Sequence, residues 1–154
     1  MTYRIDGLAP QAFASLFSMT DGELAARNAR RVVADSPTAY PCRVSLEDAA
    51  PGEELVLLNH VSHDVPTPFR TAHAIYVRKG AEMASYTDET PAYLDRRTLG
   101  LRGFDAEGML RGGLLAIPGE ADARIRELFE RPEIDTIHAH NAAVGCFLAR
   151  IERN

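Results

Sequence analysis

Alternation of apolar and polar residues runs through much of the chain and predicts a protein built mainly of β-strands. In residues 72–78 (AHAIYVR), His73, Ile75 and Val77 share one face, because successive side chains of a strand point to opposite sides. Residues 54–61 (ELVLLNHV) are apolar on both faces, which is typical of a central strand covered on both sides. Further strands are expected at 3–5 and 29–34, in a hairpin spanning 97–117 around the turn DAEG, and at 134–140 and 145–152.

Helical spacing interrupts this pattern at three places. Apolar residues at 13, 16 and 17 follow Pro10 at intervals of three and four, which predicts a first helix. Thr20 and Glu23 form a capping-box pattern that opens a second helix through about Asn28, and a third is expected at 121–131. Helices and strands do not alternate regularly, so the order favours an α+β fold. We expect one domain over residues 1–154, with a mostly antiparallel sheet and the two N-terminal helices and one late helix packed against it.

Composition narrows the classes of function. The net charge of −5, from 17 basic and 22 acidic residues, disfavours binding to a phosphate backbone. There is no run of basic residues, and Arg30–Arg31 and Arg96–Arg97 are isolated pairs. No apolar run is long enough to span a membrane. The first residues include Asp6 and lack the apolar core of a signal peptide, so a cytoplasmic protein is expected. Cys42 and Cys146 form no CxxC motif, which favours reduced thiols over a disulfide or a zinc ribbon.

The segment IHAHNAAVGCF (137–147) carries the first candidate chemistry. On a strand, His138 and His140 project from one face, and two such imidazoles could chelate a divalent transition-metal ion. A catalytic site would need a third protein ligand, for which His60, His63, His73, Cys42 or a carboxylate are the candidates. Alternatively, Ile137 and Ala139 face the core and the two histidines face solvent.

His73 and Cys42 are the candidate catalytic residues. His73 shares a face with apolar residues, so it is expected to be buried, either as a core histidine bonded to a carbonyl or as a base or ligand in a pocket. Arg43 beside Cys42 could favour a thiolate nucleophile paired with His73 or His138. The alternative for Cys42 is a small buried apolar residue. His60 and His63 are expected to be exposed, and Cys146 is expected to pack.

Three segments in their order along the chain resemble a known family: ADSPTAYPCRVSLEDAAPGEELVLLNH, PFRTAHAIYVR and IHAHNAAVGCFLARIER. They resemble the bacterial family known as domain of unknown function 1203 (DUF1203), from about Leu8 to Arg153. The resemblance implies no established activity. It does draw attention to the polar residues of these segments, among them Arg43, Arg70 and Asn141, because polar residues on loops between strands often form sites.

Two hypotheses of function follow. In the first, YPCR, PFRTAH and HAHN converge in one polar pocket of a small-ligand-binding or regulatory module, where Arg43, Arg70 and Asn141 would bind a small anionic molecule. In the second, the chain is a metal- or cysteine-dependent enzyme that uses His138, His140, His73 and Cys42. A homodimer is expected only because such dimers are the commonest assemblies.

Overall fold

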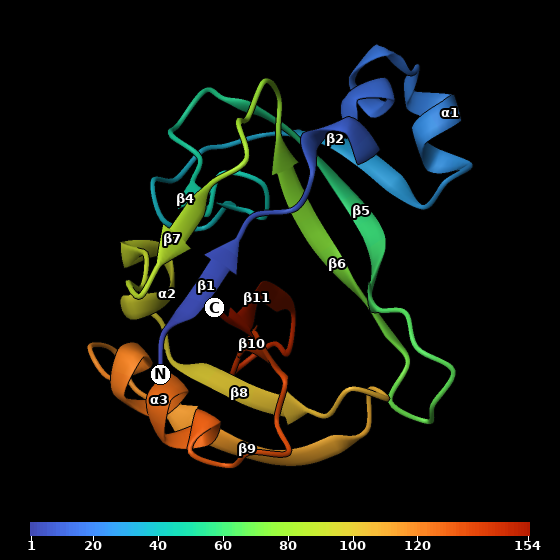
Figure 1. The fold of residues 1–154 in the computed structure, drawn as a ribbon. Helices are drawn as coiled ribbons and strands as arrows, with labels where there is room; N and C mark the ends of the chain where they lie inside the picture. Colours follow the sequence, from blue (N-terminus) through green and yellow to red (C-terminus); the bar gives the residue numbers. More distant parts are fainter.

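The computed structural model describes residues 1–154 and contains eleven strands and a few short helices (Figure 1). The strands are β1 (Tyr3–Asp6), β2 (Ala29–Val33), β3 (Pro41–Cys42), β4 (Glu47–Asp48), β5 (Glu54–His63), β6 (Thr71–Arg78), β7 (Ser85–Thr87), β8 (Leu99–Phe104), β9 (Leu110–Ala116), β10 (Thr136–Asn141) and β11 (Phe147–Arg153). The helices are the 3₁₀ turns η1 (Pro10–Ala12) and η2 (Ala14–Ser18) and the α-helices α1 (Asp21–Ala25), α2 (Ala92–Asp95) and α3 (Ala121–Phe129). None of them is long and apolar enough to cross a membrane.

The strands form two sheets where the sequence predicted one. The larger sheet has the order β7-β1-β11-β10-β8-β9, and the smaller has the order β2-β5-β6-β3-β4. All pairs are antiparallel except β3 with β6, which meet at Cys42 and Tyr76. The expected α+β class with a mostly antiparallel arrangement is therefore confirmed. The helices, however, are divided between two sheets.

The main core lies between the six-stranded sheet and α3. It comprises 18 buried residues, among them Ile125 and Leu128 of α3 and Ile137, Ala139 and Ile151 of the central strands. Burying each large aliphatic side chain contributes about 1.5–3 kcal/mol, so this cluster is the principal source of stability. The α3 stripe matches the spacing predicted from the sequence.

The N-terminal helices cover the five-stranded sheet, at the opposite end of the molecule from α3 (Figure 1). Leu24 of α1 packs with Ala29 and Val56, and Phe13 packs with Cys42 and Ile75. The capping box of α1 is present: Thr20 Oγ1 accepts from the Glu23 N–H at 3.2 Å and the Thr20 N–H donates to Glu23 Oε2 at 2.8 Å. The first predicted helix instead forms two 3₁₀ turns, which have no side-chain cap at either start.

The structure differs from the sequence prediction in two further ways. β3, β4, β7 and α2 were not predicted, because elements of two to four residues are too short to show a period. In β11, regular alternation would place Phe147 on the same face as Ala149. The pairing with β10 shifts between Ala139 and His140, so that His140 lies opposite Phe147 while Ala139 lies opposite Ala149. This bulge turns Phe147 away from the main core and toward the histidines of β10.

The junction of the two sheets depends on a close backbone approach at Gly7. A Cβ atom on Gly7 would lie 1.8 Å from the carbonyl oxygen of Val44, which also accepts a hydrogen bond from the Ala84 N–H. We predict that Gly7→Ala lowers the free energy of unfolding by about 2–3 kcal/mol, because the backbone has to move. Gly22→Ala in α1 is the control, since its nearest atom is 4.0 Å away, and it should stabilise by up to about 1 kcal/mol. Equal effects of the two changes in urea unfolding would contradict this account.

Candidate functional site

A cavity of about 390 Å³ lies where the loop before β3, the strands β5 and β6, and the β10–β11 turn meet. We call it the Arg43 pocket. Its lining contains two arginines and an asparagine and no aspartate or glutamate, so its charge is positive. The lining residues are Thr38, Ala39, Pro41, Arg43, Leu57, Ala74, Tyr76, Arg97, Asn141, Val144, Cys146 and Leu148.

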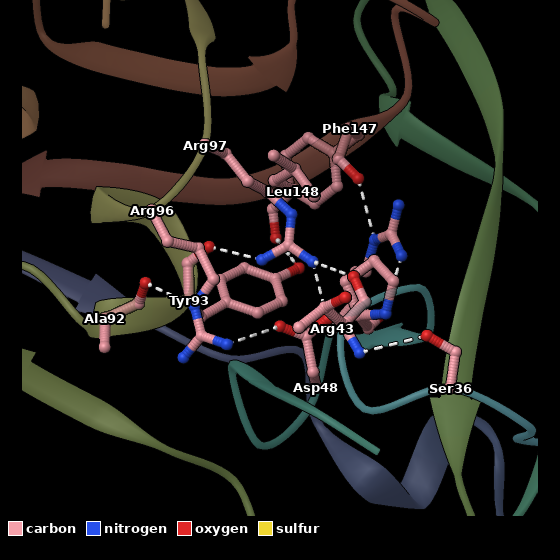
Figure 2. A network of polar contacts seen from close by, with 11 residues as sticks. Ser36, Arg43, Asp48, Ala92, Tyr93, Arg96, Arg97, Phe147 and Leu148 are labelled. Carbon is pink, nitrogen blue, oxygen red and sulfur yellow. Dashed lines mark hydrogen bonds and ion pairs between the residues drawn. The ribbon is translucent and has the colours of Figure 1, made fainter. Parts of the chain in front are cut away.

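Arg43 is the unusual residue of this pocket, because its charged side chain is only 2% exposed and has no carboxylate partner. Its Nε donates to the carbonyl oxygen of Phe147 at 2.8 Å (Figure 2). Its Nη1 donates to the carbonyl oxygen of Pro41 at 2.5 Å. Its Nη2 makes no hydrogen bond within the chain. A buried charge is stabilised when it is paired, and carbonyl dipoles offset only part of its desolvation. The pocket therefore presents an uncompensated positive charge with a free donor.

The second guanidinium of the pocket, Arg97, is neutralised within the protein. Its Nη2 lies 2.5 Å from Asp48 Oδ1 and its Nη1 donates to the carbonyl oxygen of Tyr93, over whose ring the guanidinium stacks (Figure 2). The Tyr93 hydroxyl donates to the carbonyl oxygen of Leu148 at 3.2 Å, and burial raises the Tyr93 pKa to about 12. This network connects α2 with β4 and β11 and supports one wall of the pocket.

The β10–β11 turn forms the opposite wall. Asn141 Oδ1 accepts hydrogen bonds from the backbone N–H groups of Ala143 and Val144, at 3.0 and 3.2 Å, which leaves its amide Nδ2 free to donate. Gly145 has a φ of 81°, a left-handed conformation that favours glycine. The turn places the exposed Val144 and the half-buried Cys146 at the pocket. It thus combines an amide donor with an apolar side chain and a thiol.

Of the predicted ligand-binding residues, the structure brings Arg43 and Asn141 together and leaves Arg70 elsewhere. Arg70 lies after the β5–β6 turn, where its exposed side chain pairs with Asp64 at 3.0 Å. The YPCR and HAHN segments therefore meet, and PFRTAH does not join them in this pocket. Sequence reasoning missed Leu57, Tyr76 and Arg97. The Arg96–Arg97 pair was visible, but its partner Asp48 is 49 positions away from Arg97 and nothing local connects them.

A row of histidines lies on the other side of β6. His73 and Ala74 point to opposite faces of that strand, so Ala74 lines the Arg43 pocket while His73 contacts His140. The ring centroids are 4.9 Å apart for His73 and His140, 6.3 Å for His140 and His138, and 4.9 Å for His138 and His63. We call these four residues the histidine row.

The exposure of several histidines differs from what the sequence suggested. His138 and His140 are each 2% exposed, because the face of β10 opposite the main core is covered by the β5–β6 hairpin. Of the two histidines expected to be exposed, His63 is buried against Phe104 and His60 is half-buried. His73 is half-buried, and its Nδ1 lies 3.0 Å from the hydroxyl of Ser62 rather than from a carbonyl.

Burial keeps the central histidines neutral. Desolvation, reinforced by nearby His63 and His140, lowers the pKa of His138 to about 3. Desolvation also lowers the pKa of His140 to about 4, although a hydrogen bond to Gly145 acts in the opposite direction. His140 Nδ1 lies 3.0 Å from the Gly145 carbonyl oxygen, which can only accept, so this nitrogen carries the proton. His140 Nε2 and His138 Nδ1 are buried without a hydrogen-bond partner.

The chelate predicted for His138 and His140 has no third protein ligand. No group of three or more histidine, cysteine, aspartate and glutamate side chains is arranged to hold a metal ion. Cys42 is fully buried with Phe13, Val44 and Ile75, and its Sγ accepts from the Arg78 N–H at 3.3 Å. This environment matches the alternative of a small apolar core residue better than that of a nucleophile, which must be accessible.

The neutral histidines predict how stability depends on pH. In the unfolded chain a histidine has a pKa of about 6.5, so between pH 6.5 and 4 the unfolded state binds more protons than the folded state. The free energy of unfolding should therefore be constant above about pH 7. It should fall below that by up to about 1.4 kcal/mol per pH unit for each of His138 and His140.

Urea unfolding of the wild type and of His138→Phe between pH 7.5 and 4.5 measures this dependence. The variant keeps a ring of similar size between Phe104 and Phe147. Its free energy of unfolding should fall less steeply with decreasing pH, because the contribution of one histidine is removed. An unchanged slope in His138→Phe, or NMR titration of the folded His138 ring near pH 6.5, would contradict the prediction.

Comparison with known proteins gives one family. The family model described as "Protein of unknown function (DUF1203)" matches residues 39–153, which include the histidine row and every lining residue of the Arg43 pocket except Thr38. No curated protein and no solved structure matches the chain. The match covers well over half of the sequence and agrees with the resemblance of the YPCR, PFRTAH and HAHN segments. The chain belongs to the DUF1203 family.

Proposed function

We propose that this protein is a small-ligand-binding module whose Arg43 pocket takes a small organic anion. The observation that carries the proposal is the buried Arg43 guanidinium, which has no carboxylate partner and one free nitrogen at a cavity. A carboxylate or phosphate would supply the missing counter-charge and form a charge-assisted hydrogen bond with Nη2. The free Asn141 amide offers a second donor.

The rest of the lining supports an anion that also has an apolar part. Seven of the lining residues are hydrophobic, among them Leu57, Tyr76, Val144 and Leu148. Cavities that bind small molecules commonly combine an apolar lining with a few polar groups that orient the ligand. A volume of about 390 Å³ is within the range of such sites. The ligand class we propose is therefore an aromatic or branched organic acid or phosphate ester.

The enzyme hypothesis has less support. His138 and His140 lack a third protein ligand, and Cys42 is enclosed in an apolar cluster. His73 bonds to Ser62 and faces the histidine row, not the Arg43 pocket. These residues form no group in which a nucleophile and a base lie together at a cavity.

Binding of probe molecules tests the proposal. We predict that benzoate or phenyl phosphate raises the melting temperature of the protein in a saturable manner, and that the neutral analogue benzyl alcohol does not. Arg43→Lys should weaken binding at least tenfold, because a single ammonium nitrogen cannot replace the planar fork in which Nε and Nη1 hold two separate carbonyl groups while Nη2 faces the ligand. Isothermal titration calorimetry measures the affinities.

A second pair of variants leaves Arg43 untouched. Ala74→Phe should fill the pocket and abolish binding. Ala72→Phe is its matched control, because Ala72 is an exposed alanine on the same strand that does not line the pocket. Binding that persists in Ala74→Phe, or that is lost equally in both variants, would overturn the proposal.

A further inference from the structure

A second and larger cavity, of about 690 Å³, lies beyond the far end of the histidine row, between the end of β5, the β8–β9 turn and the strands β10 and β11. We call it the acidic pocket. It is lined by four carboxylate residues and only two arginines: Asp64, Asp105, Asp135 and Glu152 against Arg150 and Arg153. Its charge is thus opposite to that of the Arg43 pocket.

The arginines of the acidic pocket are already engaged. Arg150 lies 2.6 Å from Glu152, and Arg153 donates to backbone carbonyl groups that include that of Ile134 at 2.9 Å. Asp135 takes part in no ion pair of the structure. Three of the four carboxylates are paired with arginines, namely Asp64 with Arg70, Asp105 with Arg111 and Glu152 with Arg150. Asp135 is therefore the carboxylate of this pocket that is left to attract a cation.

Two imidazoles from different sheets meet at this pocket. His63 comes from β5 and is 7% exposed, and His138 comes from β10 and is 2% exposed. Their ring centroids lie 4.9 Å apart, with the ring planes at 86°. This separation is close to that of two histidines bound to one metal ion, given a metal–nitrogen distance of about 2.0–2.1 Å.

The protonation of His63 is set by its neighbour. Its Nε2 lies 3.0 Å from the carbonyl oxygen of Gly108, which can only accept, so Nε2 carries the proton and Nδ1 has a free lone pair. Histidines that bind metals usually donate their other ring N–H to a carbonyl or carboxylate in this way. His138 makes no hydrogen bond, and its buried Nδ1 is without a partner.

From this geometry we infer that the acidic pocket binds one divalent transition-metal ion, such as Zn²⁺ or Ni²⁺, through His63 Nδ1 and a ring nitrogen of His138. Neutral imidazole is a preferred ligand for these ions. Since no third protein ligand is arranged around the pair, water completes the coordination. This site is separate from the Arg43 pocket and does not depend on the proposed anion binding.

Calorimetric titration of tag-free, chelator-treated protein with ZnCl₂ or NiCl₂ tests the inference. We expect one ion per chain, and at least tenfold weaker binding in His63→Gln and in His138→Gln. His60→Gln is the matched control, because His60 lies on the same strand, contacts Phe13 and does not line the pocket. The metal affinity should be the same with and without benzoate, which distinguishes this site from the anion site.

A measurement on the wild type avoids any loss of folding in the variants. Substoichiometric Ni²⁺ should broaden the ring NMR signals of His63 and His138 before those of His60. Absence of saturable binding, affinity unchanged in both variants, or broadening that begins at another histidine would overturn the inference.

Discussion

The packing of the two sheets against each other depends on the hydrogen bonds of Arg43. Its backbone N–H donates to Tyr76 in the five-stranded sheet, and its carbonyl oxygen accepts from Leu8, just after β1 of the six-stranded sheet. Its side chain donates to Phe147 at the start of β11. One residue thus connects both sheets through main chain and side chain. Because the guanidinium is bound by carbonyl oxygens alone, its burial leaves a positive charge that no carboxylate neutralises.

The meeting of the two sheets also explains where the polar side chains lie. The inner face of β10 would be exposed in a single sheet, but the β5–β6 hairpin covers it and encloses the histidine row. On one side of β6 lies the Arg43 pocket, with a positive lining, and at the far end of the row lies a pocket rich in carboxylates. His140 connects the row to the Arg43 pocket, because its ring N–H binds the Gly145 carbonyl of the turn that carries Asn141 and Cys146. The histidine row therefore lies between two pockets whose linings differ in their charged residues.

Much of this fold could be predicted from local pattern. The capping box at Thr20, the apolar stripe of α3 and the turn at Gly108 are properties of neighbouring residues, and each appears where expected. The partners of the strands are not local properties. Nothing near Tyr3 indicates that β1 pairs with β11, and alternation along β11 does not reveal the bulge that reverses Phe147. The burial of His63 follows from that same long-range arrangement, so it was also missed.

The site was predictable only in part for the same reason. Arg43 and Asn141 were identified because they lie in distinctive polar segments, and the fold brings those segments together. Arg70 has a similar local setting, but the β5–β6 turn directs it to Asp64 and away from the cavity. Which polar residues converge depends on strand pairing between distant segments. The local pattern of a single sequence does not indicate which distant strands pair.

We propose above that the free nitrogen of the buried Arg43 is an anion-binding group. Its Nε–H is held by the Phe147 carbonyl, so it should exchange slowly with water and give a separate signal in a ¹⁵N–¹H NMR spectrum. Titration with benzoate provides the most direct test. We predict a saturable shift of the Arg43 Nε–H signal together with the Asn141 side-chain amide, and no shift of the Arg70 signal. An unmoved Arg43 signal, or shifts confined to the exposed arginines, would contradict the account.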